Sequence, residues 1–489
     1  MRLTTMGESR NFTDSIIGIV KASDVPADRR GRYVRFFSES DSHNPPTGVP
    51  FDGYRAVLSH NELARELNVP FIHLLRESDH FREGDIVTLD GSTGIVRSLY
   101  RPYELHHHLF VTERCNSNCL MCSQPPKDKD DVEALTKRNL ELIDLIEEPP
   151  PYLTITGGEP TLLGENLFKL VSQLKTSMPT TEIHMLTNGR TFAFPEFAQN
   201  FAGVGHPNIS LGIPLYSDTA DVHDYVVQAK GAFDQTVAGF HQAARHGIRV
   251  EVRVVLHKLT IPRLTKLVDY IYRNLTFVEH IALMGLEYTG YTPRNIGELW
   301  IDPYDYQDEL ETAVEYLDAR DMNVSIYNHQ LCVLRPSLWR FARKSISDWK
   351  TLYLPECQKC SVLPSCGGIF QWAVKRHSAY IHALQSIPYI TRLMPEDEAS
   401  FQSWISQNHI HFDPAPTSDY DLRGFYKAMV AGRNAKQAKN LHFPDTWKTP
   451  YHKTFSNESQ YATTDAPRWE GDVLKDRSGK IVADHRDNE

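Results

Sequence analysis

The amino-acid sequence predicts an α/β protein: a partial (βα)6 barrel, a small N-terminal β domain and a C-terminal cysteine-rich extension. Three observations predict this fold. Six short apolar segments alternate with amphipathic stretches from residue 106 to residue 330, short alternating segments with turn signals come before them, and all seven cysteines fall into two groups. Because repeated β-then-α units imply parallel strands with right-handed crossovers, the alternation predicts a full or partial barrel.

The N-terminal region, residues 1–105, is predicted to be mostly β. Asp90-Gly91 stands between two alternating segments, 85–89 and 94–97, and an Asp-Gly pair in that setting is a hairpin signal. We expect one short helix near Asn61 to Leu67. The whole region therefore predicts a small β domain.

The barrel region, residues 106–330, shows apolar segments of strand length separated by leucines at helical spacing, such as Leu167, Leu170 and Leu174. In such a fold the chemistry lies at the C-terminal ends of the strands. The expected strands are Leu109–Thr112, Leu153–Thr156, Glu182–Thr187, Asn208–Pro214, Val250–Leu256 and His280–Leu286.

Length and composition bound the remaining possibilities. A chain of 489 residues predicts two to four domains at ~100–200 residues each, and we expect further units at 331–386 and, with unknown role, at 387–489. The net charge of −10 argues against nucleic-acid binding. No apolar run approaches membrane-spanning length, and the first residues lack the apolar core of a signal peptide. We therefore expect a cytoplasmic protein without membrane association.

The first cysteine group places three thiols, Cys115, Cys119 and Cys122, in a Cys-x3-Cys-x2-Cys loop directly after the first expected strand. A [4Fe–4S] cluster usually takes four cysteines, so three would leave one iron open to a non-protein ligand. The amino and carboxylate groups of S-adenosylmethionine (SAM) suit that position. The alternative is a zinc site completed by one of the histidines at 106–108.

This loop resembles that of the radical SAM superfamily, and Gly157-Gly158-Glu159-Pro160 after the second strand is similar to its GGEP element. The resemblance implies a radical SAM type of barrel and reductive cleavage of SAM at a cluster held by the three cysteines. Gly157 and Gly158 would let the backbone approach SAM, and Glu159 would accept from the SAM ammonium. An ordinary turn is the alternative.

Two further positions extend the resemblance. Asn188, after the third strand, is expected to reach the ribose or adenine of SAM, and Arg253, on the fifth strand, to pair with its carboxylate. A strand-end turn and a structural arginine are the alternatives. Met121 stands where the superfamily often has an aromatic residue, and its polarizable sulfur suits packing against adenine.

The second group offers four more thiols, Cys332, Cys357, Cys360 and Cys366, which suffice to saturate one cluster. Their arrangement resembles the SPASM or twitch extensions of peptide-modifying radical SAM enzymes, and this implies one auxiliary [4Fe–4S] cluster. A structural zinc site held by the same thiols is the alternative.

Three stretches, 109–114, 121–126 and 345–349, resemble the HxsC maturases of the His-Xaa-Ser peptide-modification system. The resemblance implies a ribosomally made peptide or protein as substrate. It also implies a second radical SAM maturase and a small accessory protein as partners, with flavodoxin or ferredoxin as reductant. Radical chemistry on a small molecule or RNA, and a non-catalytic iron–sulfur carrier, are the alternatives.

Overall fold

The computed structural model describes residues 4–38, 51–63, 67–76, 81–104, 106–344 and 351–384, together with three short strands between 468 and 484. The chain divides into two compact units. One contains residues 1–112, 129–184 and 204–209, and the other contains residues 113–128, 185–203 and 210–489. The domain boundaries expected at 105, 330 and 386 stay predictions.

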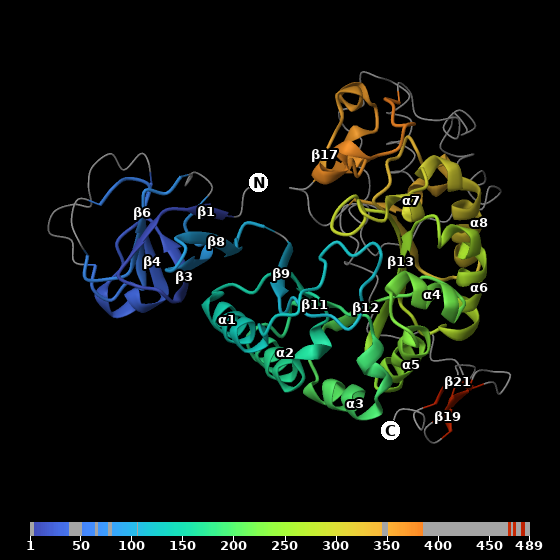
Figure 1. Cartoon of the computed structure of the whole chain (residues 1–489), viewed down its shortest axis with the longest axis horizontal. Helices are drawn as coiled ribbons and strands as arrows, with labels where there is room; N and C mark the ends of the chain where they lie inside the picture. Colours follow the sequence, from blue (N-terminus) through green and yellow to red (C-terminus); the bar gives the residue numbers. More distant parts are fainter. Residues whose placement is uncertain are drawn as a thin grey trace, which may run out of the picture. The chain divides into compact units, whose positions relative to one another are not determined.

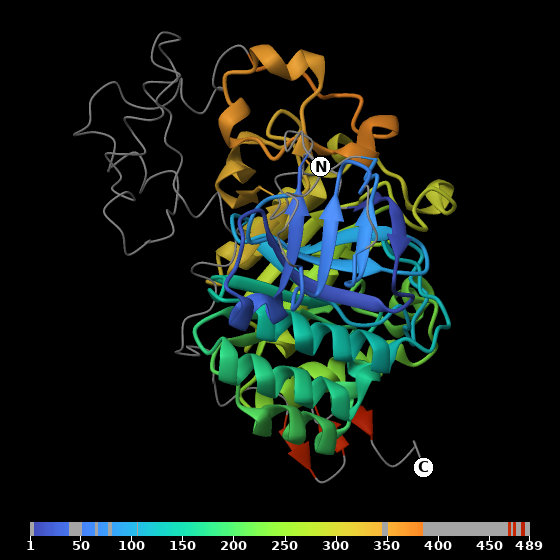
Figure 2. The ribbon, with the colours of Figure 1, turned by 90° about the vertical axis from the view of Figure 1, so that its left-hand side faces the viewer.

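The first unit begins with an eight-stranded mixed sheet in the order β1-β8-β7-β3-β4-β5-β6-β2 (Figure 1), and Figure 2 shows several of its strands side by side. The N-terminal region is thus β-rich, as its turn signals predict. The strands are β1 Thr4–Met6, β2 Glu8–Arg10, β3 Ser15–Lys21, β4 Tyr33–Phe37, β5 Ala56–Ser59, β6 Phe71–His73, β7 Ile86–Asp90 and β8 Ile95–Tyr100.

The hairpin predicted around Asp90-Gly91 is confirmed, because β7 and β8 pair antiparallel with Leu89 opposite Val96. Gly94 closes this turn with a φ of 70°, and a side chain there would collide with the carbonyl oxygen of Gly7. The helix expected near Asn61–Leu67 falls partly on residues 64–66, which lie outside the described residues.

Strand periodicity explains why this sheet carries a core on each face. Successive side chains of a strand point to opposite faces. On β4, Val34 and Phe36 join one buried apolar cluster, whereas Phe37 joins the other. The sheet is therefore covered on both sides by its own loops and neighbouring segments.

Helix α1 (Val132–Leu145) and the residues that follow it contact this sheet within the first unit. Arg32 Nη2 donates to the carbonyl oxygen of Asp144 over 3.0 Å. Tyr33 Oη donates to Glu147 Oε1 over 3.1 Å, and Arg55 pairs with Glu141. These contacts connect the N-terminal sheet to the first helix of the α/β region.

A second sheet has the order β9-β10-β11-β12-β13-β14-β15-β16, and its β9/β10, β12/β13, β13/β14, β14/β15 and β15/β16 pairs are parallel. This open parallel sheet with intervening helices is the partial barrel that the alternation predicts. The strands are β9 His106–Phe110, β10 Tyr152–Thr156, β11 Glu182–Leu186, β12 Ile209–Pro214, β13 Arg249–Leu256, β14 His280–Gly285, β15 Val324–Tyr327 and β16 Ala342–Arg343.

Two features of this sheet differ from the expectation. Strand β9 begins at His106 instead of Leu109, because His107 is buried against Tyr100 although its residue type is polar. Strands β15 and β16 extend the sheet beyond the six expected strands. They have four and two residues, which is too short for periodicity to be recognised.

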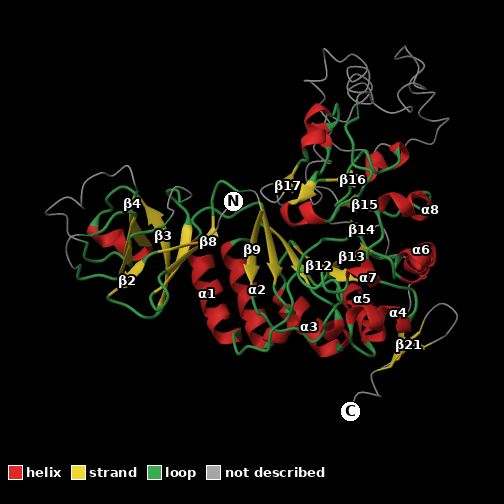
Figure 3. Cartoon of the chain, turned by 45° about the horizontal axis from the view of Figure 1, so that its top comes forward, coloured by secondary structure: helices red, strands yellow, loops and turns green. Residues whose placement is uncertain are grey.

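The helices bury the faces that their leucine spacing predicts. In α2, Leu167, Leu170 and Leu174 are buried, and α6 buries Leu264 and Leu267 in the same way. Figure 3 shows α6 and α8 on the outer side of β13 and β14. The remaining α-helices that the structure describes are α2 Glu165–Ser177, α3 Pro195–Val204, α4 Ala220–Val227, α5 Ala232–Arg245, α6 Leu264–Asn274, α7 Ile296–Leu299 and α8 Gln307–Asp318.

The region after β16 is built from 3-10 turns and a short hairpin, β17 Thr351–Leu352 with β18 Ile369–Phe370. The stretch 345–349 and most of the extension at 387–489 lie outside the described residues, apart from β19 Arg468–Glu470, β20 Val473–Lys475 and β21 Ile481–Asp484. Within the described ranges, the helices all lack the combination of length and apolar composition needed for a membrane span.

Candidate functional site

The first cysteine loop, residues 115–122, lies in the second unit and is fastened to the end of α4. The backbone N–H of Asn118 donates to Val227 O over 3.0 Å, and that of Leu120 donates to Val226 O over 2.9 Å. The last carbonyls of a helix have no partner within the helix, so they are available to bind a neighbouring loop. The loop thereby satisfies the helix end that holds it.

The connection after β14 holds the same loop from another side. The backbone N–H of Tyr291 donates to Cys122 O over 2.9 Å, and Asn295 Nδ2 donates to Leu120 O over 2.8 Å. Gly290, with a φ of 59°, lies so close that a side chain would collide with Cys122 O. Two elements distant in sequence therefore fix the backbone of the cysteine loop.

Asn188, one of the expected SAM-binding residues, contacts this loop directly. Its Nδ2 donates to Asn116 Oδ1 over 2.6 Å. Arg190 was not expected from the sequence, yet its Nη1 donates to Asn116 O over 2.6 Å and to Ser117 Oγ over 3.2 Å. Its position two residues beyond Asn188, in the same strand-end segment, is the signal that marks it.

The three thiols of the loop lie within electrostatic reach of one another. Burial raises the pKa of Cys119 to about 12, the charges of Cys122 and Cys115 raise it further, and Arg190 lowers it. Burial also raises the pKa of Cys122. A thiolate in this setting needs positive charge for its stabilisation, and bound iron supplies such charge.

Met121 is buried in an apolar cluster with Tyr216, Val226 and Leu299, next to Cys119. Tyr216 follows β12, and both the burial of its ring and the charges of Cys119 and Cys122 raise its pKa well above its ordinary value, whereas Arg253 lowers it. Tyr216 therefore lies among the thiols and Arg253. The packing of Met121 on adenine stays a prediction.

Arg253 lies on β13 in a buried polar chain. Its Nη1 donates to Glu251 Oε1 over 2.6 Å, and Glu251 Oε2 lies 2.6 Å from His280 Nδ1. Glu251 and His280 are each 1% exposed, whereas the Arg253 side chain is 19% exposed. Glu251 therefore orients Arg253, and pairing of Arg253 with the SAM carboxylate stays a prediction.

The Gly157-Gly158-Glu159 segment lies in the first unit, at the end of β10. A side chain on Gly157, which has a φ of 154°, would stand 2.6 Å from Thr112 O, and the Gly158 N–H donates to that same oxygen over 2.7 Å. Glu159 is buried and caps the 3-10 turn η2 (Pro160–Leu163), where its Oε1 accepts from Thr161 N and Oγ1. The glycines are thus required by close backbone approach, and the SAM contacts stay predictions.

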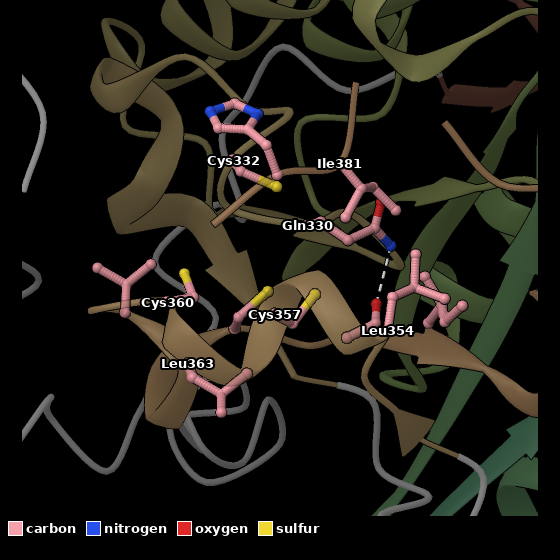
Figure 4. Close-up of a pocket in the computed structure, with 12 residues that line it drawn as sticks. Gln330, Cys332, Leu354, Cys357, Cys360, Leu363 and Ile381 are labelled. Atoms are coloured by element: carbon pink, nitrogen blue, oxygen red, sulfur yellow. Dashed lines mark hydrogen bonds between the residues drawn. The ribbon is translucent and has the colours of Figure 1, made fainter. Parts of the chain in front are cut away.

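The second cysteine group forms a pocket in the second unit. Cys332, Cys357, Cys360 and Cys366 all line it, and Figure 4 shows the first three around the cavity with Leu354, Leu363 and Ile381. The β17–β18 hairpin brackets the segment that carries the last three cysteines. Gln330 supports the lining by donating to Gly368 O over 2.8 Å.

Backbone amides surround these four thiols. Burial raises the pKa of Cys332 to about 11, while hydrogen bonding to the His382 backbone lowers it. Burial likewise raises the pKa of Cys366, which the backbones of Gly368 and Leu331 lower. The Leu384 N–H donates to Cys360 Sγ over 3.5 Å. Amide hydrogen bonds to sulfur are a means by which proteins tune bound metal clusters.

The donor set of each group fits an iron–sulfur cluster. Among the described residues, no three His, Cys, Asp or Glu side chains are gathered closely enough for one metal ion. A cubane does not require such gathering, because each thiolate binds its own iron. His107, a candidate zinc ligand, stacks on Tyr100 with ring centroids 4.1 Å apart, and burial lowers its pKa to about 4.

The fold and the first loop together define a class: an α/β partial-barrel protein with three cysteines directly after the first strand of its parallel sheet. Residues 109–271 of this chain match the model of the radical SAM superfamily. That part of the chain is therefore of the radical SAM type, and the cofactors of that superfamily are a [4Fe–4S] cluster and SAM. The chain carries the three cysteines for the cluster.

Known proteins resemble the same part of the chain. A pre-heme d1 synthase from Dinoroseobacter shibae is 30% identical over 193 residues, which cover 38% of this chain and 45% of that protein. A GTP 3′,8-cyclase from Petrotoga mobilis is 29% identical over 153 residues, which cover 30% of this chain and 46% of that protein. The chain thus spans less than half the length of either relative.

A solved structure, that of Streptococcus suis SuiB bound to SAM, aligns with 46% of this chain and 50% of its own. The TM-score is 0.37 and the sequence identity 15%. A likeness this distant says nothing of activity.

Proposed function

We propose that this protein is a radical SAM enzyme that modifies a ribosomally synthesised peptide or protein. The observation that carries the enzymatic part is the cysteine loop, which lies inside the segment that matches the radical SAM model and is fastened by three other elements. When bound, the cluster and SAM would supply a 5′-deoxyadenosyl radical by one-electron reductive cleavage, with an electron from flavodoxin or ferredoxin.

The residues of the chain have defined tasks in this proposal. Cys115, Cys119 and Cys122 hold the cluster and leave one iron open for SAM. Asn188 and Arg190 keep the loop in place through Asn116. Glu159 would accept from the SAM ammonium, with Gly157 and Gly158 allowing close approach, and Arg253, oriented by Glu251, would pair with the SAM carboxylate.

The pocket of four thiols supports an auxiliary [4Fe–4S] cluster. With four thiolates available, every iron has a protein ligand, so electron transfer is a better-matched role than direct substrate binding. Apolar residues and backbone amides line the pocket, and such surroundings tune a cluster potential. Iron and zinc analysis of a chain that lacks the first three cysteines separates this proposal from a structural zinc site.

The peptide substrate is supported by the resemblance of residues 109–114, 121–126 and 345–349 to the HxsC maturases. The same resemblance supports a second radical SAM maturase and a small accessory protein as partners, and a cytoplasmic location. A small-molecule substrate is the second candidate, because the names of the relatives include GTP 3′,8-cyclase and pre-heme d1 synthase.

The first experiment asks whether the chain cleaves SAM. Full-length protein is reconstituted anaerobically with iron and sulfide, and 5′-deoxyadenosine is measured after addition of SAM and dithionite. We expect production in the wild-type chain and none in Cys119→Ala, because the cluster loses one of three anchors. Production by Cys119→Ala at the wild-type rate would contradict the assignment of the loop.

The second experiment separates the two substrate classes. A short His/Ser-repeat peptide and GTP are supplied in parallel reactions, and mass spectrometry follows each for a change in mass. The peptide proposal predicts a modified peptide and more 5′-deoxyadenosine in its presence. A changed nucleotide and an unchanged peptide would support the small-molecule candidate instead.

A further inference from the structure

The connection from β14 to α8, residues 286–306, contacts the surroundings of both cysteine groups within the second unit. We propose that this connection is a strut shared by the two cysteine sites, and that Asp302 is a positioning residue for the four-thiol pocket. The proposal rests on the proposed function only in the identity of the metal that each site holds.

The first end of the strut holds the Cys115–Cys122 loop. Tyr291 N and Asn295 Nδ2 donate to the carbonyl oxygens of Cys122 and Leu120. The Leu299 carbonyl oxygen in turn accepts from Lys258 N over 2.9 Å, and Thr292 is fully buried. The strut is therefore anchored to the sheet region as well as to the loop.

The second end is organised by Asp302. Its Oδ1 accepts from Ser378 Oγ over 2.6 Å and from Tyr304 N over 3.0 Å, and its Oδ2 accepts from Ala379 N over 2.9 Å. Ser378 is 2% exposed and also accepts from Tyr380 N over 3.1 Å. One carboxylate thus fixes the turn at 378–380 to the strut.

Two ring contacts reinforce this junction. Tyr304 and Tyr380 stack with centroids 3.9 Å apart and an interplanar angle of 16°. The Arg376 guanidinium lies 4.7 Å above the ring of Trp300. Both contacts join the strut to the chain segment that leads into the pocket, so the junction does not depend on a single hydrogen-bonded group.

The segment that Asp302 holds continues directly into the lining of the pocket. Ile381 and His382 line it (Figure 4), and the His382 backbone hydrogen-bonds to the Cys332 thiol. Leu384 N donates to Cys360 Sγ over 3.5 Å, and Leu384 O accepts from Ser361 N over 2.8 Å. Asp302 therefore acts on two thiols through the backbone of residues 378–384.

The test uses the full-length chain with the three cysteines of the first loop replaced by serine, so that only the second site holds metal. In this background Asp302→Ala should release iron to a chelator at least about fivefold faster than the parent, a fold-change typical of coupled sites. It should also shift the reduction potential and the EPR signature of the cluster, because amide donors move away from sulfur.

Matched variants separate positioning from general damage. Asp305→Ala removes an exposed carboxylate from the same 3-10 turn and should behave as the parent does. Asp302→Asn keeps one acceptor oxygen and should give an intermediate release rate. Equal release rates from Asp302→Ala and Asp305→Ala would overturn the positioning role.

The other end is tested in a chain whose second-site cysteines are replaced by serine. Asn295→Ala should speed iron release from the first loop, whereas Gly297→Ala, which has open space around its Cα, should not. If Asn295→Ala matches Gly297→Ala, the strut does not hold the first site. The two arms together decide whether one connection supports both sites.

A metal-independent readout keeps this inference distinct from the proposed function. If the second site binds zinc or no metal, the auxiliary cluster is refuted. The rate at which iodoacetamide alkylates Cys332 and Cys360 in the metal-free chain then tests the strut. We expect faster alkylation in Asp302→Ala than in Asp305→Ala, and equal rates would overturn the proposal.

Discussion

At the scale of single residues, the side chains that hold the first cysteine loop are as informative as the cysteines. Arg190 donates to Asn116 O and Ser117 Oγ, and its charge lowers the pKa of the Cys119 thiol. The cysteines, Gly157, Gly158 and Asn188 could be singled out from sequence because each stands at a strand end. Arg190 could not, because an arginine after a strand is ordinarily solvated.

Arg190 gives the first residue-scale prediction. Arg190→Gln removes charged hydrogen bonds worth about 1.5–3 kcal/mol each, so the loop should hold its ligands less firmly. We expect SAM to bind about tenfold more weakly or worse, as measured by equilibrium binding to the reconstituted chain. Arg245→Gln, at an exposed position on α5, is the control and should bind SAM as the wild type does.

At the scale of elements, the turn after β10 shows why a glycine motif can be required by packing alone. Gly157 approaches the chain after β9 so closely that its Cα faces Thr112 O, and Gly158 N hydrogen-bonds to the same oxygen. The turn therefore needs glycine whether or not SAM binds beside it. Loss of SAM binding in a Gly157 variant would not by itself identify a SAM contact.

Gly157→Ala is the second prediction. Its added carbon would lie 2.6 Å from Thr112 O, so the free energy of unfolding should fall by about 1–3 kcal/mol. Gly203→Ala in α3 is the matched control, because no atom lies within 4 Å of its added carbon. Alanine favours a helix over glycine, so this control should match or exceed wild-type stability. Urea unfolding of both variants measures the difference, and equal stability would contradict the close approach.

Elements also mark where periodicity ends as a guide. Strands β10 to β14 lie within one residue of their expected bounds, because apolar alternation and strand length agree there. Strand β16 has two residues and pairs with β15 only because the fold brings them together. Its sequence contains no local signal for that pairing.

At the scale of the whole molecule, buried neutral histidines link stability to pH. Burial lowers the pKa of His241 and His257 to about 3, and that of His107, His223 and His329 to about 4. An unfolded histidine titrates near 6.5, so below that pH the unfolded chain binds protons that the folded chain does not. Folding stability is therefore complete above pH 6.5 and is lost as the pH falls toward 4.

His241→Leu tests this linkage. His241 is 4% exposed and packs against Phe277. Removing one buried histidine should reduce the loss of stability between pH 6.5 and pH 5 by about 1–2 kcal/mol, since each titrating group contributes about 1.4 kcal/mol per pH unit. Denaturant unfolding at pH 8 isolates the packing effect of the substitution, and the pH 5 measurement adds the proton linkage. An unchanged pH slope would show that His241 is not neutral in the folded chain.

The sequence by itself determined the α/β class, the N-terminal hairpin, most barrel strands and the two cysteine groups, because these depend on local periodicity and on spacing along the chain. The tertiary structure alone decided that Arg190 and Asn295 hold the first loop, that Glu251 orients Arg253, and that Asp302 anchors the segment beside the four-thiol pocket. Each of these contacts joins residues or elements whose nearness is set by how the strands pair and the connections fold. A sequence pattern carries no record of which distant donor will meet which carbonyl or carboxylate oxygen.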